Sequence, residues 1–161
     1  MTVTGDRHLS IAEAGAAGLI QGPRDAGRRD DSPTAFPAAG IAALCALYPT
    51  EIVGVAGEFA AFASSQHHGR TALAGLKLRT RLINGGTTHF RLFGQVLTGP
   101  RWTDITAARR RVLQPGVGAE DYLKNGLTLH VQYDYTFAPG EDRSLATGRF
   151  LVGLALPLGS R

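Results

Sequence analysis

Residues 126–137 read GLTLHVQYDYTF, a stretch in which large apolar residues alternate with polar ones. Neighbouring side chains of a β-strand point to opposite faces, so this period of two predicts a strand with one apolar and one polar face. The apolar face consists of Leu127, Leu129, Val131, Tyr133, Tyr135 and Phe137. The polar face consists of Thr128, His130, Gln132, Asp134 and Thr136. The same alternation recurs in other segments, and the function depends on which face is inside.

Length and composition restrict the class of protein. The chain has 161 residues, of which 43% are hydrophobic, and this predicts one domain over residues 1–161. No stretch reaches the roughly 18 consecutive apolar residues of a membrane helix, so the chain is either soluble or spans a membrane as strands. The 21 glycines favour an all-β protein with many turns and close packing.

Charge and cysteine content exclude several classes. The net charge is +4, but the 17 Lys and Arg residues are scattered and no base-stacking motif accompanies them, so we expect no nucleic-acid partner. The single cysteine, Cys45, excludes an internal disulfide and a cysteine-based zinc cluster. The start, MTVTGDRHLS, lacks the basic and then apolar pattern of a signal segment, so we expect a leader to lie outside this numbering.

The pattern predicts eight strands, at residues 8–20, 38–48, 52–62, 71–82, 88–98, 110–122, 126–137 and 148–156. The first segment is also compatible with a short helix, because IAEAGAAGLI is rich in alanine. Residues 21–35, rich in Arg, Asp and Gly, are expected as a mobile loop.

The expected connections alternate in length. The long ones contain QGPRDAGRRDDSPTAF, ASSQHHGR, GPRWTDITA and APGEDRSLA, and the short ones contain PTE, INGGT and LKNG. Asn84-Gly85 and Asn125-Gly126 supply hairpin turns at the short end. Long loops at one end and tight turns at the other predict a single closed antiparallel up-and-down barrel of about eight strands.

Sorting the strands by parity indicates which face is inside. One set is bulky and apolar, and it includes Val53, Val55, Phe59, Leu76, Leu78, Phe90, Leu92, Val96, Val117, Tyr133, Tyr135, Phe137, Phe150, Val152 and Leu154. The other mixes glycine and alanine with Glu58, Lys77, Arg79, Arg91, Glu120, His130, Asp134 and Arg149. An eight-stranded barrel has an interior just wide enough for side chains to fill, so the bulky set is expected to face lipid. The alternative is a soluble lipocalin-like barrel, in which the bulky face turns inward around an apolar small molecule.

The polar set then predicts an ionic network in the lumen. Buried charges need partners, so Glu58, Glu120 and Asp134 are expected to meet Lys77, Arg79, Arg91 and Arg149, with His130 among them. Tyr133, Tyr135, Phe137 and Phe150 are expected on the outer surface as membrane-interface aromatics. The rest of the inward set is expected to be small.

Four segments in order resemble a known family. They are EIVGVAGEF (51–59), FRLFGQVLTG (90–99), LQPGVGAEDYLKNGLTLHVQYDYTF (113–137) and GRFLVGLALPLG (148–159). Their order resembles the outer-membrane protein β-barrel domain family of bacterial envelopes, in its small eight-stranded OmpA-like class. The matching positions are Pro115, Gly116 and Gly118, then Asp134 and Tyr135, then Arg149, Phe150 and Gly153. One departure is the final LPLGSR, which stands where many such barrels end in an aromatic residue.

Other chemistry-bearing residues have simpler interpretations. His67 and His68 lack the three or four converging ligands of a metal site, which favours a solvated loop. His130, Asp134 and Glu58 are residue types used in acid/base catalysis, but a structural network explains them, and no motif supports an enzyme or a cofactor. Arg109–Arg111 beside Trp102 are expected either to contact anionic lipid headgroups at the rim or to form a plain solvated loop end.

These observations predict a small outer-membrane β-barrel with a polar, plugged lumen. We expect it to be a monomer in the bilayer of the cell outer membrane and to act as a structural or surface-interaction protein. Lipopolysaccharide or another surface ligand is the expected partner of the long loops.

Overall fold

The computed structural model describes residues 11–23, 38–65, 68–85, 88–104, 106–123, 126–139 and 147–158. Its regular elements are the strands β1 (Ile11–Pro23), β2 (Ala38–Tyr48), β3 (Val53–Ala63), β4 (His68–Arg79), β5 (Ile83–Gly85), β6 (Thr88–Thr103), β7 (Thr106–Tyr122), β8 (Thr128–Thr136) and β9 (Thr147–Pro157). The all-β expectation is therefore confirmed. Within the described residues, no helix has the length and apolar character needed to cross a membrane.

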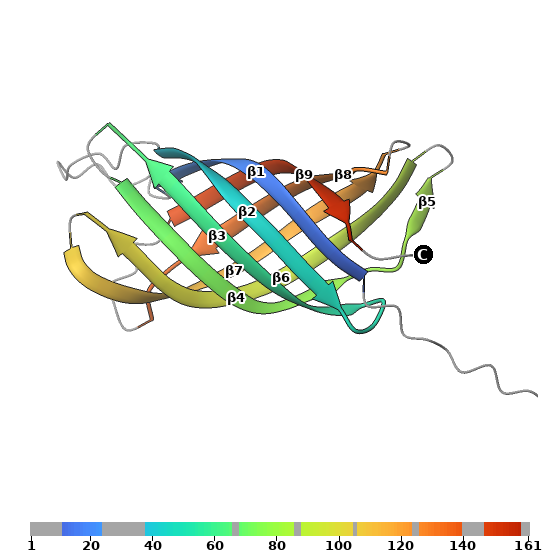
Figure 1. The fold of residues 1–161 in the computed structure, drawn as a ribbon, viewed down its shortest axis with the longest axis horizontal. Helices are drawn as coiled ribbons and strands as arrows, with labels where there is room; N and C mark the ends of the chain where they lie inside the picture. Colours follow the sequence, from blue (N-terminus) through green and yellow to red (C-terminus); the bar gives the residue numbers. More distant parts are fainter. Residues whose placement is uncertain are drawn as a thin grey trace, which may run out of the picture.

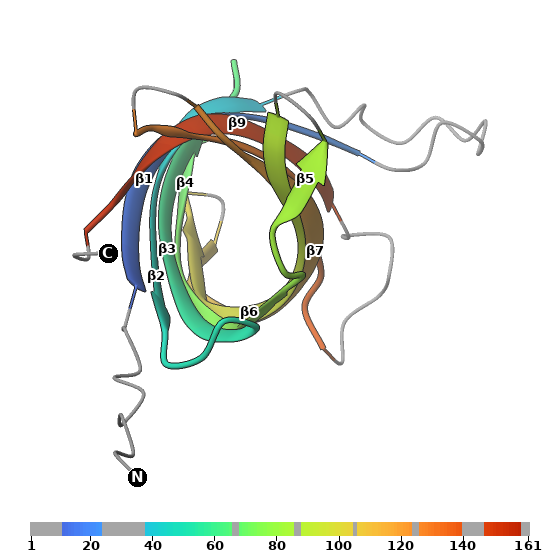
Figure 2. The ribbon, with the colours of Figure 1, turned by 90° about the vertical axis from the view of Figure 1, so that its right-hand side faces the viewer.

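The eight long strands form one closed antiparallel ring (Figures 1 and 2). Each pairs with the next long strand along the chain, and β4 pairs directly with β6. The ring closes where β1 meets β9, with Ala17 opposite Gly153. This is the predicted up-and-down barrel, in which every connection joins neighbouring strands.

The connections divide the barrel into two ends. The turn end, on the right in Figure 1, carries the connections β2–β3, β4–β6 and β7–β8. The loop end, on the left, carries β1–β2, β3–β4, β6–β7 and β8–β9. The strands cross the barrel at a clear tilt, as closure of a sheet into a barrel requires.

Two of the four connections predicted to be long are short. β3 ends at Ala63 and β4 begins at His68, so only residues 64–67 join them. β6 continues to Thr103 and β7 begins at Thr106, so the loop predicted at residues 99–107 is wrong. Gly99 and Pro100 look like strand breakers, but they pair with Val112 and Arg111 and extend the hairpin to a bulge near Arg101.

The turn end differs from the prediction at one hairpin. Asn84 pairs with His89 and Gly85 with Thr88, so these two residues belong to β5 and are not the turn. The second predicted turn agrees better with the structure. Gly126 has a φ of 84°, a conformation that glycine adopts freely, and its N–H donates to the Leu123 carbonyl at 3.0 Å.

The first segment is a strand and not a helix. β1 pairs along its length with both β2 and β9, so its backbone groups are used in the sheet. Its many alanines and glycines carry little strand preference, and the closed ring determines its conformation. The loop predicted at residues 21–35 overlaps the end of β1 at Pro23, and residues 24–37 lie outside the described residues.

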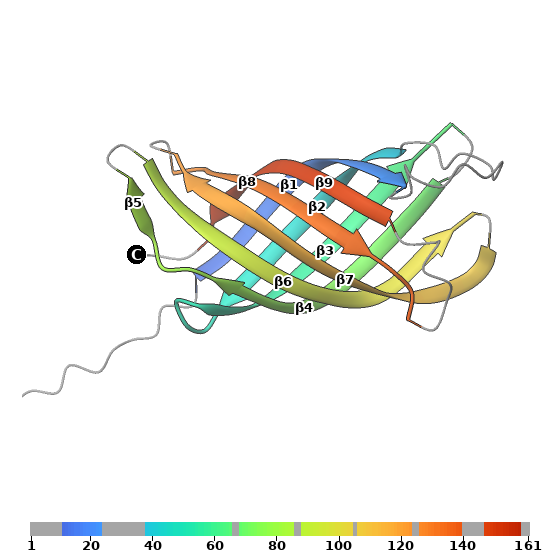
Figure 3. The ribbon, with the colours of Figure 1, turned by 180° about the vertical axis from the view of Figure 1, so that it is seen from behind.

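The two faces of the wall differ as predicted. Figure 3 shows β6, β7, β8 and β9 side by side. Large apolar side chains of these strands are exposed on the outer face. The exposed set includes Leu92 and Val96 on β6, Val117 on β7, Tyr133 on β8, and Phe150, Val152, Leu154 and Leu156 on β9.

The interior is less polar than predicted. Six bulky apolar side chains are buried in it, namely Tyr48, Leu73, Phe93, Leu97, Val112 and Leu151. The expectation that uncharged inward residues are small is therefore wrong. Segments such as FRLFGQVLTG have apolar residues on both faces, and the inward ones fill the barrel between the charged groups.

Candidate functional site: an ionic network inside the barrel

Arg149 on β9 lies between two carboxylates in the barrel interior. Its Nη1 and Nη2 donate to Oε1 and Oε2 of Glu58 at 2.7 and 2.6 Å. Its Nε and Nη2 donate to Oδ2 of Asp134 at 3.2 and 2.6 Å. All three side chains are buried. Glu58 on β3 and Asp134 on β8 lie on opposite sides of the ring, so Arg149 links opposite walls of the barrel.

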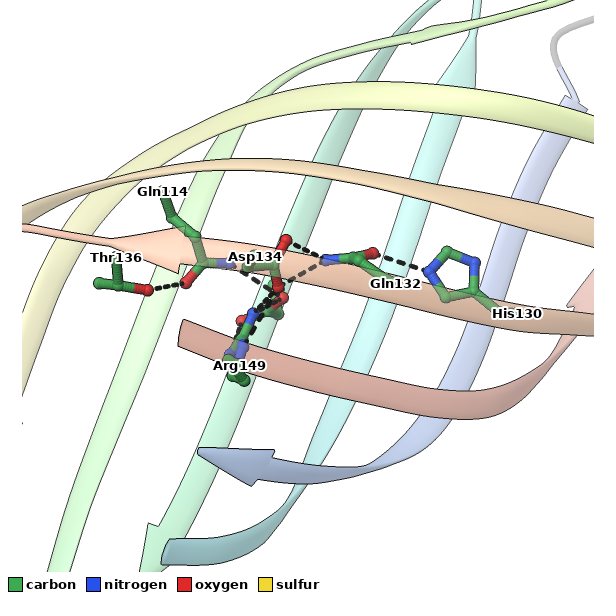
Figure 4. Close-up of polar contacts among 7 residues, drawn as sticks. Gln114, His130, Gln132, Asp134, Thr136 and Arg149 are labelled. Carbon is green, nitrogen blue, oxygen red and sulfur yellow. Dashed lines mark hydrogen bonds and ion pairs between the residues drawn. The ribbon is translucent and has the colours of Figure 1, made fainter. Parts of the chain in front are cut away.

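A row of polar side chains continues from Asp134 along β8 (Figure 4). The Gln132 amide nitrogen donates to both Asp134 oxygens, at 2.7 and 2.8 Å. The Gln132 amide oxygen lies 2.7 Å from Nε2 of His130. Because that oxygen can only accept, Nε2 of His130 carries a hydrogen. The other ring nitrogen, Nδ1, then faces Glu120 Oε1 at 3.7 Å.

The second carboxylate cluster is centred on Glu120 of β7. Lys77 on β4 donates a hydrogen bond to Glu120 Oε1, and both residues are buried. The Lys77 ammonium lies 3.9 Å from the centre of the Phe93 ring, which stacks on His130 at 4.8 Å. Phe93 therefore contacts both Lys77 and His130, and it stabilises the buried ammonium by cation–π attraction.

Neutral side chains complete the hydrogen bonding around Arg149. The amide nitrogen Nε2 of Gln114 on β7 lies 3.4 Å from Glu58 Oε2. The amide oxygen Oε1 of Gln114 accepts a hydrogen bond from the Thr136 hydroxyl at 3.0 Å (Figure 4). Gly116 is the cross-strand partner of Asp134, and a Cβ there would overlap the Asp134 carboxylate. The missing side chain leaves the space that Asp134 occupies.

The other two predicted cations, Arg79 and Arg91, have aromatic partners. The Arg79 guanidinium lies 3.5 Å from the Tyr48 ring, and its Nε donates to the Glu51 carbonyl at 2.9 Å. Arg91 donates to the Tyr122 hydroxyl at 3.2 Å. The structure thus brings together Glu58, Asp134 and Arg149, and separately Lys77, Glu120 and His130, while Arg79 and Arg91 lie nearer the turn end.

Sequence reasoning missed the residues that connect the two clusters. Gln132 lies between His130 and Asp134 on the same strand face, so parity alone could have added it to the network. Phe93 has the inward parity of Arg91 and Gln95, but its apolar character suggested no role there. The Gln114–Thr136 contact between strands could be found only once the register was known.

A small cavity borders the ionic network. A cavity of about 30 Å³ lies among Glu58, Lys77, Gln95, His130 and Gln132. Space of this size holds about one or two water molecules, which suits a site lined by polar groups. Among the described residues, no group of three or more His, Cys, Asp and Glu side chains is arranged to hold a metal ion.

The predicted interface aromatics lie on the outer face, and two of them are well exposed. Tyr133 and Phe150 are each 46% exposed, whereas Asp134, next to Tyr133 in sequence, is 0% exposed. Tyr135 and Phe137 are partly covered and lie near each other, with ring centres 5.8 Å apart. All four lie in the half of the barrel nearer the loop end.

A closed eight-stranded barrel with ion pairs inside and apolar side chains outside has the architecture of small outer-membrane β-barrels. Comparison with solved structures supports this fold. Neisserial surface protein A is similar with a TM-score of 0.58 and 9% identity, over 91% of this chain and 96% of that chain. The attachment invasion locus protein Ail of Yersinia pestis gives 0.51 and 14%, over 94% and 99%. The outer membrane protein AlkL gives 0.52 and 10%, over 99% and 95%.

Sequence comparison adds no closer assignment. No protein-family model matches the chain, and no curated protein matches it. The chain therefore shares a fold with these barrels.

Proposed function

We propose that the protein is a small β-barrel of the bacterial outer membrane that spans the bilayer as a monomer. The observation that carries the proposal is that charged groups lie inside the barrel and apolar groups outside. Arg149, Glu58 and Asp134 are buried in the interior, while large aliphatic side chains face outward. Soluble monomers rarely expose a contiguous apolar patch of more than a few hundred Å². A band of exposed Leu, Val and Ile residues around the wall is suited to lipid.

The strand geometry supports the same proposal. A membrane-spanning strand needs about 9–11 tilted residues, and β2, β3, β4 and β9 have 11, 11, 12 and 11. Each long strand has a neighbouring strand on both sides, so barrel closure requires no second chain. This favours the monomer.

We further propose that the lumen is plugged. Leu97, Leu151 and Gln132 are almost fully buried in the interior, where Arg149 forms salt bridges with Glu58 and Asp134. The cavity of about 30 Å³ has room for water and not for a solute. The same features argue against the lipocalin-like alternative, which needs an apolar cavity in place of buried charges.

A structural or surface-interaction role follows for a barrel without a transport path. The loop end is the side on which the outward aromatics gather, and we propose that it faces the cell exterior. Ail was crystallised with the heparin analogue sucrose octasulfate, a precedent for ligand binding by a barrel of this size. We propose no catalytic role, because the buried titratable groups are engaged with one another.

The test is cell fractionation followed by gel electrophoresis of the detergent-extracted protein. We expect the chain in the outer-membrane fraction and a mobility that differs between unheated and boiled samples. Recovery of folded protein from the soluble fraction without detergent would refute the membrane assignment. Planar-bilayer recordings of the inserted protein test the plug, and a steady open conductance would contradict it.

A further inference from the structure

A groove lies on the outer face of the barrel near the loop end. It has a volume of about 820 Å³, within the roughly 300–1,000 Å³ of small-molecule sites. Four of its residues form a row across adjacent strands, because Ile41 of β2 pairs with Ala61 of β3, Ala61 with Arg70 of β4, and Arg70 with Trp102 of β6. The groove therefore runs around the wall and not into the lumen.

The floor and one wall of the groove are apolar. Small residues, Ala39, Ala61 and Ala63, form the floor, while Ile41 and Phe59 project beside them. Ile41 is 71% exposed, so a large apolar surface is available on this side. A flexible hydrocarbon chain can follow such a channel, because it makes contact without needing hydrogen bonds.

The opposite wall is cationic and amphipathic. Arg70 is exposed in the groove, and the Arg109 guanidinium lies 5.7 Å from the Trp102 ring. Arg111 is exposed beside Pro100, one row nearer the barrel centre. The groove also contains the carboxylate of Asp104, whose Oδ2 accepts the backbone N–H of His68 at 3.0 Å. The exposed arginines on this side outnumber the one carboxylate, so the wall next to the interfacial tryptophan is positive.

We propose that this groove binds an acylated lipid of the surrounding leaflet whose phosphate groups give it a net negative charge. One acyl chain would lie over Ala61 between Phe59 and Trp102, and the phosphate would lie between Arg70 and Arg109. The inference rests on the proposed outer-membrane function, because only a membrane-inserted barrel presents this groove to lipid. A phosphate suits this wall because arginine guanidinium groups form paired, charge-assisted hydrogen bonds with phosphate oxygens.

Trp102 is the only tryptophan of the chain and provides the readout. The protein is folded into phosphatidylcholine vesicles, and diphosphorylated lipid A is added in steps while Trp102 fluorescence is recorded. We expect a saturable change at low mole fraction. Lipid A without its phosphates should produce no such change, and free inorganic phosphate should not reproduce it.

Two variants address the two parts of the site. Arg70→Gln/Arg109→Gln should weaken the apparent affinity by about tenfold or more, because charge-assisted hydrogen bonds are lost. Ala61→Phe should weaken binding by filling the floor. The matched controls are Arg81→Gln, an exposed cation at the turn end, and Ala74→Phe, an outward position on β4 outside the groove, and both should titrate like the original protein.

The outcomes separate this inference from the proposed function. If the chain shows no heat-modifiable folded form in vesicles, the proposed function fails. If it folds but Trp102 responds equally to lipid A with and without phosphates, or the groove variants titrate like their controls, the lipid site is refuted and the barrel assignment stands. If crosslinking shows that a second copy of the chain covers Trp102, the groove is a contact between protomers and the lipid proposal is overturned.

Discussion

Glu58 and Arg149 are 91 positions apart in the sequence and meet inside the barrel through two parallel hydrogen bonds of 2.6 and 2.7 Å. This paired geometry between a guanidinium and a carboxylate is among the stronger hydrogen-bonded contacts in proteins. It also fixes the relative heights of β3 and β9, which are not neighbours in the ring. The contact therefore requires the closed barrel, and it contributes to keeping the strands in register.

Replacement of Arg149 should be strongly destabilising. Arg149→Met leaves Glu58 and Asp134 without their shared cation, and breaking a buried pair costs about 3–5 kcal/mol. Urea titration of the protein in lipid vesicles, followed by gel mobility, measures the loss of stability. Arg81→Met, at an exposed cation of the turn end, is the control and should change little.

Neutralising the whole cluster should restore part of that loss. The triple variant Glu58→Gln/Asp134→Asn/Arg149→Met contains no unpaired charge. Replacing a buried ion cluster by uncharged groups often leaves the stability unchanged. We expect the triple variant to be more stable than Arg149→Met alone. A triple variant that is no more stable than Arg149→Met would mean that unpaired buried carboxylates are not the cause of the loss.

Gly116 should not tolerate a side chain. A Cβ at this position would overlap the Asp134 carboxylate, so Gly116→Ala should displace Asp134 from Arg149 and lower the unfolding midpoint. Gly94→Ala is the matched control on β6, where the nearest atom to an added Cβ is the Gly116 carbonyl oxygen at 3.9 Å. If both variants unfold at the same urea concentration, the close packing around Asp134 is not required.

A charged side chain on the outer wall should destabilise the barrel strongly in the middle of the apolar band and only slightly at its edge. Val152 lies halfway along β9 and faces outward, so Val152→Arg should destabilise the inserted barrel by about 2–4 kcal/mol. Leu158→Arg lies beyond the end of β9 and should cost about 0–1 kcal/mol, as expected near the interface. The free energy of unfolding, measured in vesicles, distinguishes the two variants. If both lose the same amount of stability, Val152 lies in water.

The sequence predicts the barrel well where polar and apolar residues alternate strictly. In β8 the alternation from Leu129 to Thr136 divides the residues cleanly between two faces, and the structure shows the same division. In β1 the residues are small on both faces, so strand and helix could not be separated until pairing with β2 and β9 was known. Phe93 and Leu97 escaped prediction because β6 also carries apolar residues outward at Leu92 and Val96.

Pairing across the interior is harder to predict than the strands themselves. Parity places Glu58, Glu120, Asp134, Lys77 and Arg149 inward, but their heights depend on strand tilt and register. The match between Glu58 and Arg149 follows from the closed ring and from no local pattern. Loop lengths were misjudged for a related reason, because pairing of Gly99 and Pro100 with β7 overrides their usual role as strand breakers.

Cys45 allows the orientation of the wall to be measured directly. It is the only cysteine of the chain, lies on β2 and is exposed on the outer face. A nitroxide label attached to Cys45 in the vesicle-inserted protein is tested for collision with oxygen, which concentrates in lipid, and with a water-soluble nickel complex. If the outward-facing apolar side chains lie in lipid, the label should collide often with oxygen and rarely with the nickel complex. Frequent collisions with nickel and few with oxygen would place this face in water and contradict the membrane-spanning barrel.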